Sequence, residues 1–460
     1  MQAGHRGIVV DQIAKLRLLH LSDIHFQKKD GNHLDLDLDI RNELERDLNG
    51  LRKRLGAFEG ILVTGDVAFS GQRDEYAAAM EWLTHVTTIA GCPGHHLWTV
   101  PGNHDVDRGV LQGNVIPVLR QGLRSCDDFT LDDLLKTYLE DPYAREALFW
   151  PFKEYNEFAK SFLCQTEADH LWWDYDLPLN DRSILRLRGV NSALVSDERD
   201  DDAANRLIVS LAQATITRQS GVSYLVMCHH PLTWLKSRDS IEDLWNTRSA
   251  IQLFGHKHRQ RVFRINESAV LCAGATLPHR REPNWAPCYS VIEMWVEREG
   301  AARRLKLDIH HRIWHPARTK FMAEPAEDGR DYHSLALALD DWEVQDAVNP
   351  APDDAPQGPL QDAPQLEGPG LEPSPGGEML KMDAARRLAY RFLMLPYIMR
   401  MRIALDLELL EEADQWSSDP ELYQSLFHRA KERQRLGDLW YAVEMAHPDS
   451  DAQSNPYVGK

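Results

Sequence analysis

The chain has 460 residues, of which 43% are hydrophobic and 27% charged, a composition that excludes a mini-protein, a fibrous protein and a wholly disordered chain. Its formal net charge of -19 argues against broad electrostatic binding to nucleic acid or anionic lipid, although a local basic groove stays open. A chain of this length predicts two domains rather than one core.

Six cysteines are scattered along the chain without a C-x-x-C pair. This spacing indicates neither a zinc ribbon nor a disulfide framework, so reduced thiols are expected. The first residues hold no apolar run typical of a signal peptide, and no later stretch reaches the roughly 18 apolar residues of a membrane span. We therefore expect a cytoplasmic protein without a membrane partner.

The first part of the chain alternates apolar runs with helical patterns. Strand-like runs at 16–22, 60–65 and 95–102 are separated by amphipathic segments at 39–56 and 74–90, a rhythm typical of β-α-β units. After Asp107 this rhythm breaks, and residues 108–183 read as a mostly helical, aromatic insertion that would cover one side of a site. Strand-like segments then resume, which predicts an α/β domain over residues 1–345.

The composition changes after this domain. Residues 346–380 are rich in Pro, Gly and acidic residues and contain no Lys or Arg, which predicts a disordered linker. Residues 381–460 return to helical periodicity and predict a small all-α domain, in which Asp419 and Pro420 match an N-cap followed by proline at the first helical position. Its expected apolar positions include Leu388, Phe392, Leu395, Met399, Ile403, Leu422, Leu426, Leu439, Trp440 and Val443.

Polar residues that can bind metals follow five of the predicted strands. Their carboxylate, amide and imidazole groups suit Mn, Fe, Zn or Ni, with Mn favoured, rather than a metal that prefers thiolates. In D-x-H and H-x-H pairs, alternate residues of an extended chain point to the same side and can bind one ion together. A single carboxylate such as Asp66 can bridge two ions about 3.5–4 Å apart, the separation used in two-metal hydrolysis. The candidate ligands are Asp23, His25, Asp66, Asn103, His229, His256 and His258.

Each of these motifs alone has an ordinary explanation as a turn or a loop. However, five such motifs occur in order, each after an apolar strand, and turns or loops alone poorly explain the whole set. Glycines at 65, 102 and 255 would let the backbone turn sharply next to the ions. The remaining histidines are expected elsewhere: His20 and His230 in the core or behind the ligands, and His310, His311 and His315 on a strand surface.

The motifs DIH, GDVAFSG, GNHD, CHHP and GHKH resemble those of the calcineurin-like metallophosphoesterase superfamily, over roughly residues 16–320. The resemblance implies a four-layer αββα sandwich with a dinuclear metal centre at the strand ends. It places two divalent metal ions: one on Asp23, His25 and His258, the other on Asn103, His229 and His256, with Asp66 bridging. It also implies that a metal-bound hydroxide attacks phosphorus in line.

By the same resemblance, His104 is the catalytic histidine, placed over the scissile phosphate to stabilise charge or protonate the leaving oxygen. Phosphoprotein phosphatases and repair nucleases of the family carry an aspartate three residues after the bridging one, where this chain has Phe69. That difference disfavours both branches. Asp105 could orient His104 or a ligand, and an N-cap role for it is an equal alternative.

TGDVAFSG and VPGNHDVDR look most like the branch that contains cyclic-nucleotide phosphodiesterases. The expected substrate is therefore a phosphodiester or nucleotide. Within the insertion, Trp150, Trp172 and Trp173 could stack on a base, but core packing is the simpler use. Arg280 and Arg281 could contact phosphate, although surface arginines seldom have so specific a role.

The C-terminal helices resemble the effector-associated, death-like adaptor modules of bacterial conflict systems. That resemblance implies an effector enzyme in antiviral defence, recruited by a protein partner with a like helical domain. Trp440 and Leu439 would then fill the bundle core. Two other functions are weighed against this one. A nuclease acting on DNA or RNA would need a basic groove that this acidic chain does not indicate, and a scaffold with a vestigial site would not need the complete ligand set.

Overall fold

The structure is a computed structural model that describes residues 14–27, 35, 37–113, 115–197, 200, 207–282, 285–299 and 302–342, and in the C-terminal part 388, 391–392, 395, 400, 403–404, 407, 409–411 and 419–445. The chain divides into two units, Met1–Val344 and Gln345–Lys460. The predicted linker 346–380 lies outside the described residues.

The first unit contains a seven-stranded sheet in the order β12-β11-β10-β1-β2-β3, with β13 paired to β11. Neighbours β1, β2 and β3 are parallel, as the predicted β-α-β units require, and the other pairs are antiparallel. The strands are β1 (Leu16–Leu21), β2 (Gly60–Val63), β3 (Leu97–Thr99), β10 (Cys288–Glu299), β11 (Ala302–His315), β12 (Lys320–Ala323) and β13 (His333–Leu339).

A six-stranded sheet lies against the first, in the order β4-β5-β6-β7-β9-β8. Its four central strands are parallel, and the edge strands β4 and β8 are antiparallel to their neighbours. The strands are β4 (Trp172–Pro178), β5 (Ile184–Val190), β6 (Val222–Cys228), β7 (Ile251–Phe254), β8 (Arg261–Ile265) and β9 (Ser268–Cys272).

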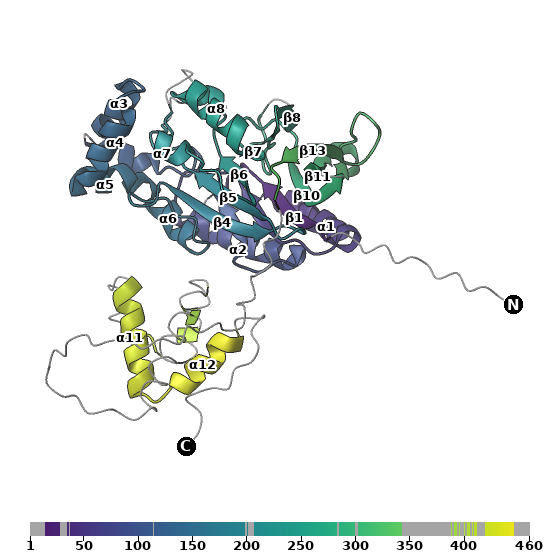
Figure 1. The fold of residues 1–460 in the computed structure, drawn as a ribbon. Coiled ribbons are helices and arrows are strands. Elements are labelled where there is room, and N and C mark those ends of the chain that lie inside the picture. The colour runs from purple at the N-terminus through teal and green to yellow at the C-terminus, as the bar shows by residue number, and fades with distance from the viewer. Residues whose placement is uncertain are drawn as a thin grey trace, which may run out of the picture. The chain divides into compact units, whose positions relative to one another are not determined.

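Helices cover the outer face of each sheet, so the first unit is the four-layer αββα sandwich that the resemblance implied (Figure 1). Helices α1 (Leu38–Leu55) and α2 (Arg73–Ala90) pack on the first sheet, and α7 (Leu211–Ala214) and α8 (Arg238–Arg248) on the second. Strand β6 shows why its sequence is apolar throughout: Leu225 and Met227 face the core between the sheets, whereas Val226 and Cys228 face the helices.

Helices make up most of the predicted insertion after residue 107. They are η1 (Arg108–Gln112), α3 (Val115–Ser125), α4 (Leu131–Glu140), α5 (Pro142–Phe149), η2 (Trp150–Phe152) and α6 (Lys153–Lys160). The expectation of helix up to residue 183 is wrong at its end, because Trp172–Pro178 is strand β4. Trp173 and Leu177 are buried while Asp174 and Asp176 are exposed, the two-residue alternation of a half-buried strand.

The C-terminal unit contains α11 (Asp419–Glu432) and α12 (Leu436–Met445). The start of α11 agrees with the Asp-Pro signal in the sequence. Leu439 and Trp440 are buried in the core of this unit, as expected, together with Leu388, Phe392, Leu395, Ile403, Ala404, Leu409, Tyr423, Leu426, Ala430 and Val443. Met399 lies outside the described residues.

Three further expectations concern the cysteines, membrane spans and the burial of histidines. All six cysteines are free. Within the described residues, no helix combines the length and the apolar character that crossing a membrane requires. The expected surface position of His310 and His311 is wrong: both are buried in β11, where Glu293 binds His310 Nε2 (3.2 Å) and Ser290 Oγ binds His311 Nδ1 (2.9 Å). His315, at the strand end, is exposed.

Candidate metal centre

All seven candidate ligands lie at one edge of the sandwich, just beyond the ends of β1, β2, β3, β6 and β7. Parallel strands bring these ends together. Five of the seven have a left-handed backbone, with φ between 50° and 68°. Such residues cost about 1–3 kcal/mol each when they are not glycine. They are Asp23, His25, Asp66, His256 and His258.

Backbone hydrogen bonds between the first two loops hold this strained conformation. The amide of Asp23 donates to the carbonyl of Gly65 (3.0 Å), and the amides of Ile24 and His25 both donate to the carbonyl of Asp66 (2.9 and 3.0 Å). The loop after β1 is thus paired with the loop after β2. This pairing fixes Asp23, His25 and Asp66 relative to one another before any ion binds.

Asp66 occupies the middle of the group. Its Oδ2 atom lies 3.3 Å from His25 Nε2 and 3.3 Å from His229 Nε2. Its Oδ1 atom accepts a hydrogen bond from the amide of His104 (2.8 Å). One carboxylate oxygen therefore contacts histidines from both halves of the site.

On one side of Asp66, Asp23, His25 and His258 offer ligand atoms that all lie within 4.8 Å of one another. Asp23 Oδ1 is 3.1 Å from His258 Nε2. On the other side, Asn103 Oδ1 lies 3.2 Å from His229 Nε2 and 3.0 Å from His256 Nδ1. The structure thus brings all seven predicted ligands together in two neighbouring groups.

His230 also comes close to the second group, since its ring nitrogens and those of His229 and His256 include atoms within 4.8 Å of one another. Its Nδ1 atom is hydrogen-bonded to Ser192 Oγ (2.8 Å), and its Nε2 atom has no partner among the described residues. Burial, with the charges of His229 and His256, lowers the pKa of His230 well below its usual value. This buried, neutral ring agrees with the expected place behind the ligands, as does His20, which is bonded to Thr64 Oγ1.

The carboxylates and imidazoles of the centre shift each other's pKa values. Burial opposes ionisation of Asp23, but the imidazoles of His258 and His229 outweigh burial and lower the pKa of Asp23 to about 2. Burial also opposes ionisation of Asp66, but His229, His25 and His104 together outweigh it and lower the pKa of Asp66 well below its usual value. Burial would lower the pKa of His229, yet Asp66 and Asp23 raise it to about 9. Both carboxylates are therefore ionised at neutral pH and attract positive charge.

His104 lies beside the ligands and is oriented by the main chain. Its Nδ1 atom is 2.7 Å from the backbone carbonyl oxygen of Phe69, which can only accept, so Nδ1 carries the hydrogen. Its ring packs edge-on against His25, with centroids 4.7 Å apart. Burial lowers the pKa of His104, the charges of His25 and Arg108 add to this effect, and Asp66 opposes it. The carbonyl of Phe69 thus orients the ring of His104.

Asp105 does not contact the ring of His104. Its carboxylate accepts hydrogen bonds from the amides of Ala68 (3.0 Å) and Gly102 (2.9 Å) and from the hydroxyl of Tyr76 (2.9 Å). Burial and the charge of Asp66 raise the pKa of Asp105 to about 6, while these donors act in the opposite direction. The residue joins the loops after β2 and β3, and so positions Asp66 and Asn103 through the backbone.

Sequence reasoning missed Glu282, whose Oε2 atom lies 2.6 Å from His258 Nδ1 and whose Oε1 atom accepts from the amide of His279 (2.7 Å). This carboxylate fixes the tautomer of His258, as the carbonyl of Thr64 does for His229 at 2.7 Å from Nδ1. No local motif marks Glu282, because it lies 24 residues after the histidine that it contacts.

Glycines next to the ligands have two different roles. Gly65 has a φ of 89°, which favours glycine, as expected. Sharp turning is the wrong explanation for Gly102 and Gly255, which lack a positive φ. A Cβ atom at Gly102 would lie 2.1 Å from Asp66 Oδ1, and one at Gly255 would lie 2.4 Å from Ser22 Oγ. Both are small because ligand-bearing loops pass close to them.

Among the other residues considered for substrate binding, Trp173 packs in the core as expected, and Trp150 does not. Trp173 is buried and donates from Nε1 to the carbonyl of Thr99 (3.0 Å), whereas Trp150 is exposed and Trp172 half-buried. Arg280 pairs with Asp37 (3.1 Å) and lies over the ring of Trp285.

Comparison with curated proteins finds a metallophosphoesterase-like protein of Bacillus subtilis, YydB, 24% identical over 260 residues, 53% of this chain and 49% of that protein. The chain thus matches about half the length of this relative. Similar solved structures include GAP50 of Plasmodium (TM-score 0.36, 11% identity, 73% of this chain and 92% of that chain) and the purple acid phosphatase PPD1 of yellow lupin (0.36, 13%, 71% and 54%).

Two family models match the chain. Residues 384–445 match the GTPase-associated adaptor domain, so the C-terminal unit contains an adaptor module of the kind suspected from the sequence. Residues 16–260, more than half of the chain, match the calcineurin-like phosphoesterase model, and this match covers every strand end that carries a candidate ligand. The protein therefore belongs to the calcineurin-like phosphoesterase family, whose members are hydrolases that act on phosphoesters.

Proposed function

We propose that the protein is a dinuclear metal-dependent phosphodiesterase that acts on small nucleotide substrates. The observation that carries this proposal is the central position of Asp66 Oδ2, 3.3 Å from a histidine of each ligand group. In the proposed site, Asp23, His25 and His258 hold one ion, Asn103, His229 and His256 hold the other, and Asp66 bridges them.

The chemistry of the donor groups fits two divalent ions. Carboxylate and amide oxygens and imidazole nitrogens suit Mn, Fe, Zn or Ni, and manganese is the ion that we favour. The hydrogen bonds of His229 Nδ1 and His258 Nδ1 leave Nε2 of each ring available to an ion. The raised pKa of His229 has the same origin, since the carboxylates that favour a proton on this ring also favour a metal cation.

Bound ions would supply a water of lowered pKa and would neutralise charge on the phosphoryl oxygens. The protein's own residues then orient the substrate and transfer a proton. Because His104 donates from Nδ1 to the carbonyl of Phe69, its Nε2 atom is left to bind the substrate. When Nε2 also carries a proton, the imidazolium would stabilise a phosphoryl oxygen or give that proton to the leaving oxygen, and the carbonyl of Phe69 positions the ring for this step.

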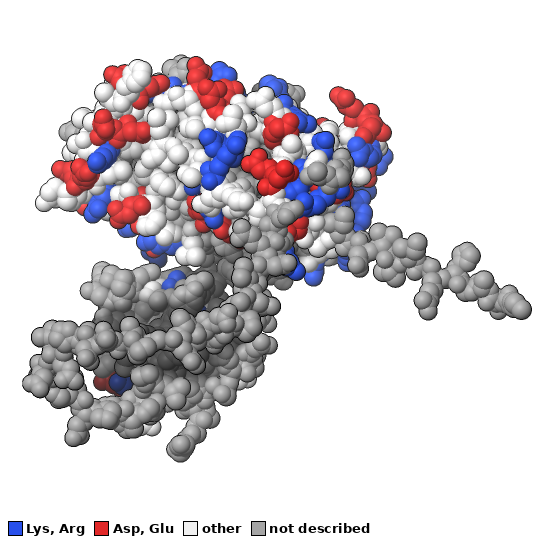
Figure 2. All heavy atoms as spheres, in the orientation of Figure 1, with Lys and Arg blue, Asp and Glu red and all other residues white. Residues whose placement is uncertain are grey.

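Charge favours small substrates over a nucleic-acid polymer. Over the described residues visible in Figure 2, acidic and basic side chains of the first unit are interspersed rather than separated into a basic track. The net charge of -19 adds to this, because binding a polymer depends on many simultaneous phosphate contacts. Hydrolysis of DNA or RNA is the alternative outcome of the substrate screen below.

The test compares two variants on bis-p-nitrophenyl phosphate with Mn²⁺. Asp66→Asn should lose both hydrolysis and bound metal, because one oxygen of the Asp66 carboxylate lies 3.3 Å from a histidine ring of each ligand group. His104→Ala should keep its metal and lose about 10²–10⁴-fold in kcat, the usual contribution of an acid–base group. Full activity and metal in Asp66→Asn would contradict the site, and a metal-free His104→Ala would make His104 a ligand. Cyclic nucleotides, dinucleotides and nucleic acid are then screened with the wild type.

The adaptor module supports a second proposal, that the enzyme is an effector of bacterial antiphage defence. The name of the matched family links such modules to GTPases, and we propose recruitment by a partner of that kind with a like helical domain. The buried Leu439 and Trp440 would maintain the module's core while its surface binds the partner.

Deletion of residues 346–460 tests whether the adaptor module is needed for protection of cells but not for hydrolysis. All proposed ligands precede residue 260, so the truncated enzyme should keep near-wild-type turnover on bis-p-nitrophenyl phosphate and lose protection of cells against phage. Full-length Asp66→Asn is the matched control, which should lose protection and turnover together. An inactive truncated enzyme would mean that the helices complete the catalytic domain, and protection by the truncated enzyme would exclude recruitment through the module.

A further inference from the structure

A cavity of about 320 Å³ lies in the helical insertion, between η1, α3 and the segment after β5. Among the described residues that line it, three are arginines and one is an aspartate, so this described lining carries a net positive charge in a chain that is strongly acidic overall. We call this space the arginine cavity. Its lining includes Arg108, Arg120, Arg124 and Asp197, with Leu111 and Pro117 on its apolar side.

The buried arginines of this cavity are not fully hydrogen-bonded. Arg120 is only 2% exposed; its Nη2 atom donates to the carbonyl of Ser196, and its Nη1 atom has no partner within the described part of the chain. Arg124 binds Asp197 Oδ2 (2.5 Å) and the carbonyl of Val195, but its Nε atom likewise has no described partner. A buried, unpaired guanidinium donor is costly, so these atoms call for an acceptor.

Electrostatics point in the same direction. Burial is the main cause that lowers the pKa of Arg120 to about 9; the charge of Arg124 adds to this effect, and Asp200 and Asp197 oppose it. Arg120 and Arg124 are one helical turn apart on α3 and therefore face the same space. Both guanidinium groups line the arginine cavity, and phosphate, an anion with several oxygen acceptors, is the group whose geometry arginine matches best.

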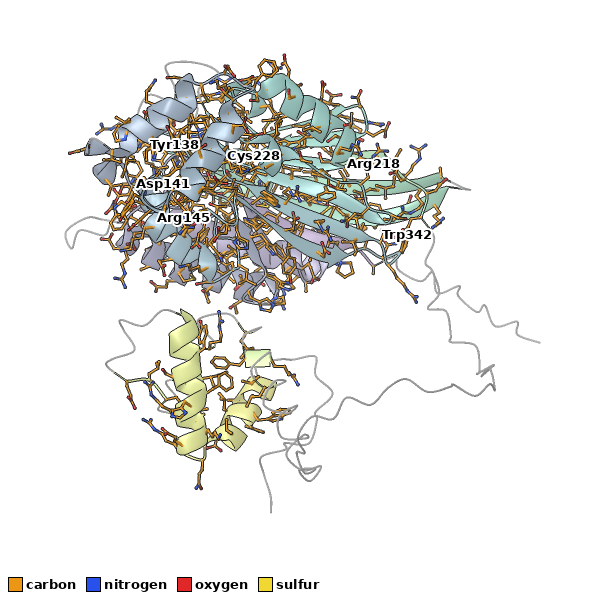
Figure 3. All side chains as sticks on the ribbon, turned by 60° about the vertical axis from the view of Figure 1, so that its left-hand side comes forward. Tyr138, Asp141, Arg145, Arg218, Cys228 and Trp342 are labelled. Carbon is orange, nitrogen blue, oxygen red and sulfur yellow. The ribbon has the colours of Figure 1, made fainter. Side chains whose placement is uncertain are left out.

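Two observations connect the arginine cavity with the metal centre. Arg108 starts η1 four residues after His104, and its charge contributes to the lowered pKa of that histidine. From the other side, Lys236, which follows His229 after the 3-10 helix η4 (Leu232–Trp234), donates to the carbonyl of Arg124 (3.0 Å). Figure 3 shows Cys228, the residue before His229, near the middle of the unit, between Tyr138 and Asp141 on one side and Arg218 and Trp342 on the other.

We propose that the arginine cavity binds a second phosphate group of the substrate while the scissile phosphodiester is at the metal centre. The substrate class is then a nucleotide with a further phosphate beyond the bond that is cleaved. This inference rests on the proposed function, since it places the reacting phosphate on the ligands described above. Arg108 and Arg120 act as specificity residues for that second phosphate.

Two pairs of substrates that differ by one phosphate test this assignment. The first is the p-nitrophenyl ester of thymidine 5′-phosphate with and without a 3′-phosphate, and the second is the dinucleotide TpT with and without a 5′-phosphate. With the Mn²⁺-loaded wild type, kcat/KM should be about 10- to 100-fold higher for the phosphorylated member of at least one pair, as expected for charge-assisted hydrogen bonds.

Arg120→Gln and Arg108→Gln should reduce this ratio toward one. Arg108 makes no hydrogen bond or ion pair with a described residue, so its variant should fold even if the buried Arg120 variant does not. Arg145→Gln removes the same charge from exposed α5 and should keep the wild-type ratio. Melting temperature and metal content confirm that each variant is intact.

The possible failures are distinct. Equal kcat/KM within both pairs for the wild type would refute the arginine cavity as a substrate site and leave the phosphodiesterase proposal standing. A preference that survives in Arg108→Gln and in a folded Arg120→Gln would refute it as well. If the metal-loaded wild type hydrolyses no member of either pair and no bis-p-nitrophenyl phosphate, the proposed function fails, and the inference that rests on it fails too.

Discussion

Replacing Gly102 with alanine tests how closely the loops of the metal centre must approach. The added Cβ would lie 2.1 Å from Asp66 Oδ1 and 2.7 Å from the amide nitrogen of Asp66. Ordinary contacts begin at 3.4 Å, so the carboxylate or the loop that carries Asn103 must retreat by the difference between 3.4 and 2.1 Å. Asp66 is buried and bonded to His104 on the same side, which leaves it little freedom to do so.

A misplacement of about 1 Å at a reacting centre can cost on the order of 10²-fold in rate. We therefore expect Gly102→Ala to lose about 100-fold in kcat on bis-p-nitrophenyl phosphate and part of its metal, measured by elemental analysis. Gly94→Ala is the control, because a Cβ there has nothing within 4 Å. If Gly102→Ala keeps full metal and a kcat within about twofold of the control, Asp66 does not need its observed position, and the bridging assignment is wrong.

Three further predictions concern residues outside the ligand set. Glu282→Gln should weaken metal affinity about 10–100-fold in a competition assay with a chelator, because it loosens His258, and an unchanged affinity would make the 2.6 Å contact incidental. Burial would raise the pKa of Glu293, but His310, Lys15 and Arg17 lower it to about 2. The ionised group therefore stabilises the fold above its ordinary pKa near 4.5, and this stabilisation is lost as the pH falls toward 2. Glu293→Gln should thus lower the melting temperature at pH 7 and flatten its decline below pH 5; equal acid sensitivity of wild type and variant would refute this. Gly50→Ala, at an exposed position of α1 with nothing within 4 Å, should raise the free energy of unfolding by about 0.5–1 kcal/mol, and a decrease would contradict the open space seen there.

The strand ends that carry the seven candidate ligands were predictable because two signals coincide there. A buried parallel strand is apolar on both faces, and the polar residue that follows it, such as Asp66 or His229, stands out sharply. Strand β4 was missed because its aromatic residues suggested a packed helix, although Trp173 and Leu177 alternate with exposed aspartates. His310 and His311 were misplaced because their acceptors, Glu293 and Ser290, come from a neighbouring strand.

Contacts between residues far apart in the chain could not be predicted from the sequence. The carbonyl of Phe69 gives no signal in the sequence, because every residue at that position would offer the same backbone oxygen to His104. Glu282 reaches His258 only because the segment after β9 returns to the strand ends. The arginine cavity had one local signal, the spacing of Arg120 and Arg124 by one helical turn, but the spacing alone does not show that these side chains are buried.

The left-handed backbone at five of the seven candidate ligands has an evolutionary consequence. Each of these residues lowers the free energy of unfolding, because glycine or asparagine at the same position would remove part of the backbone strain. Selection for hydrolysis must therefore oppose the replacement of these residues by glycine or asparagine. In a descendant that is retained only for its adaptor module, small residues should replace Asp23, His25 and His258 early, and the fold should become harder to melt as the chemistry disappears.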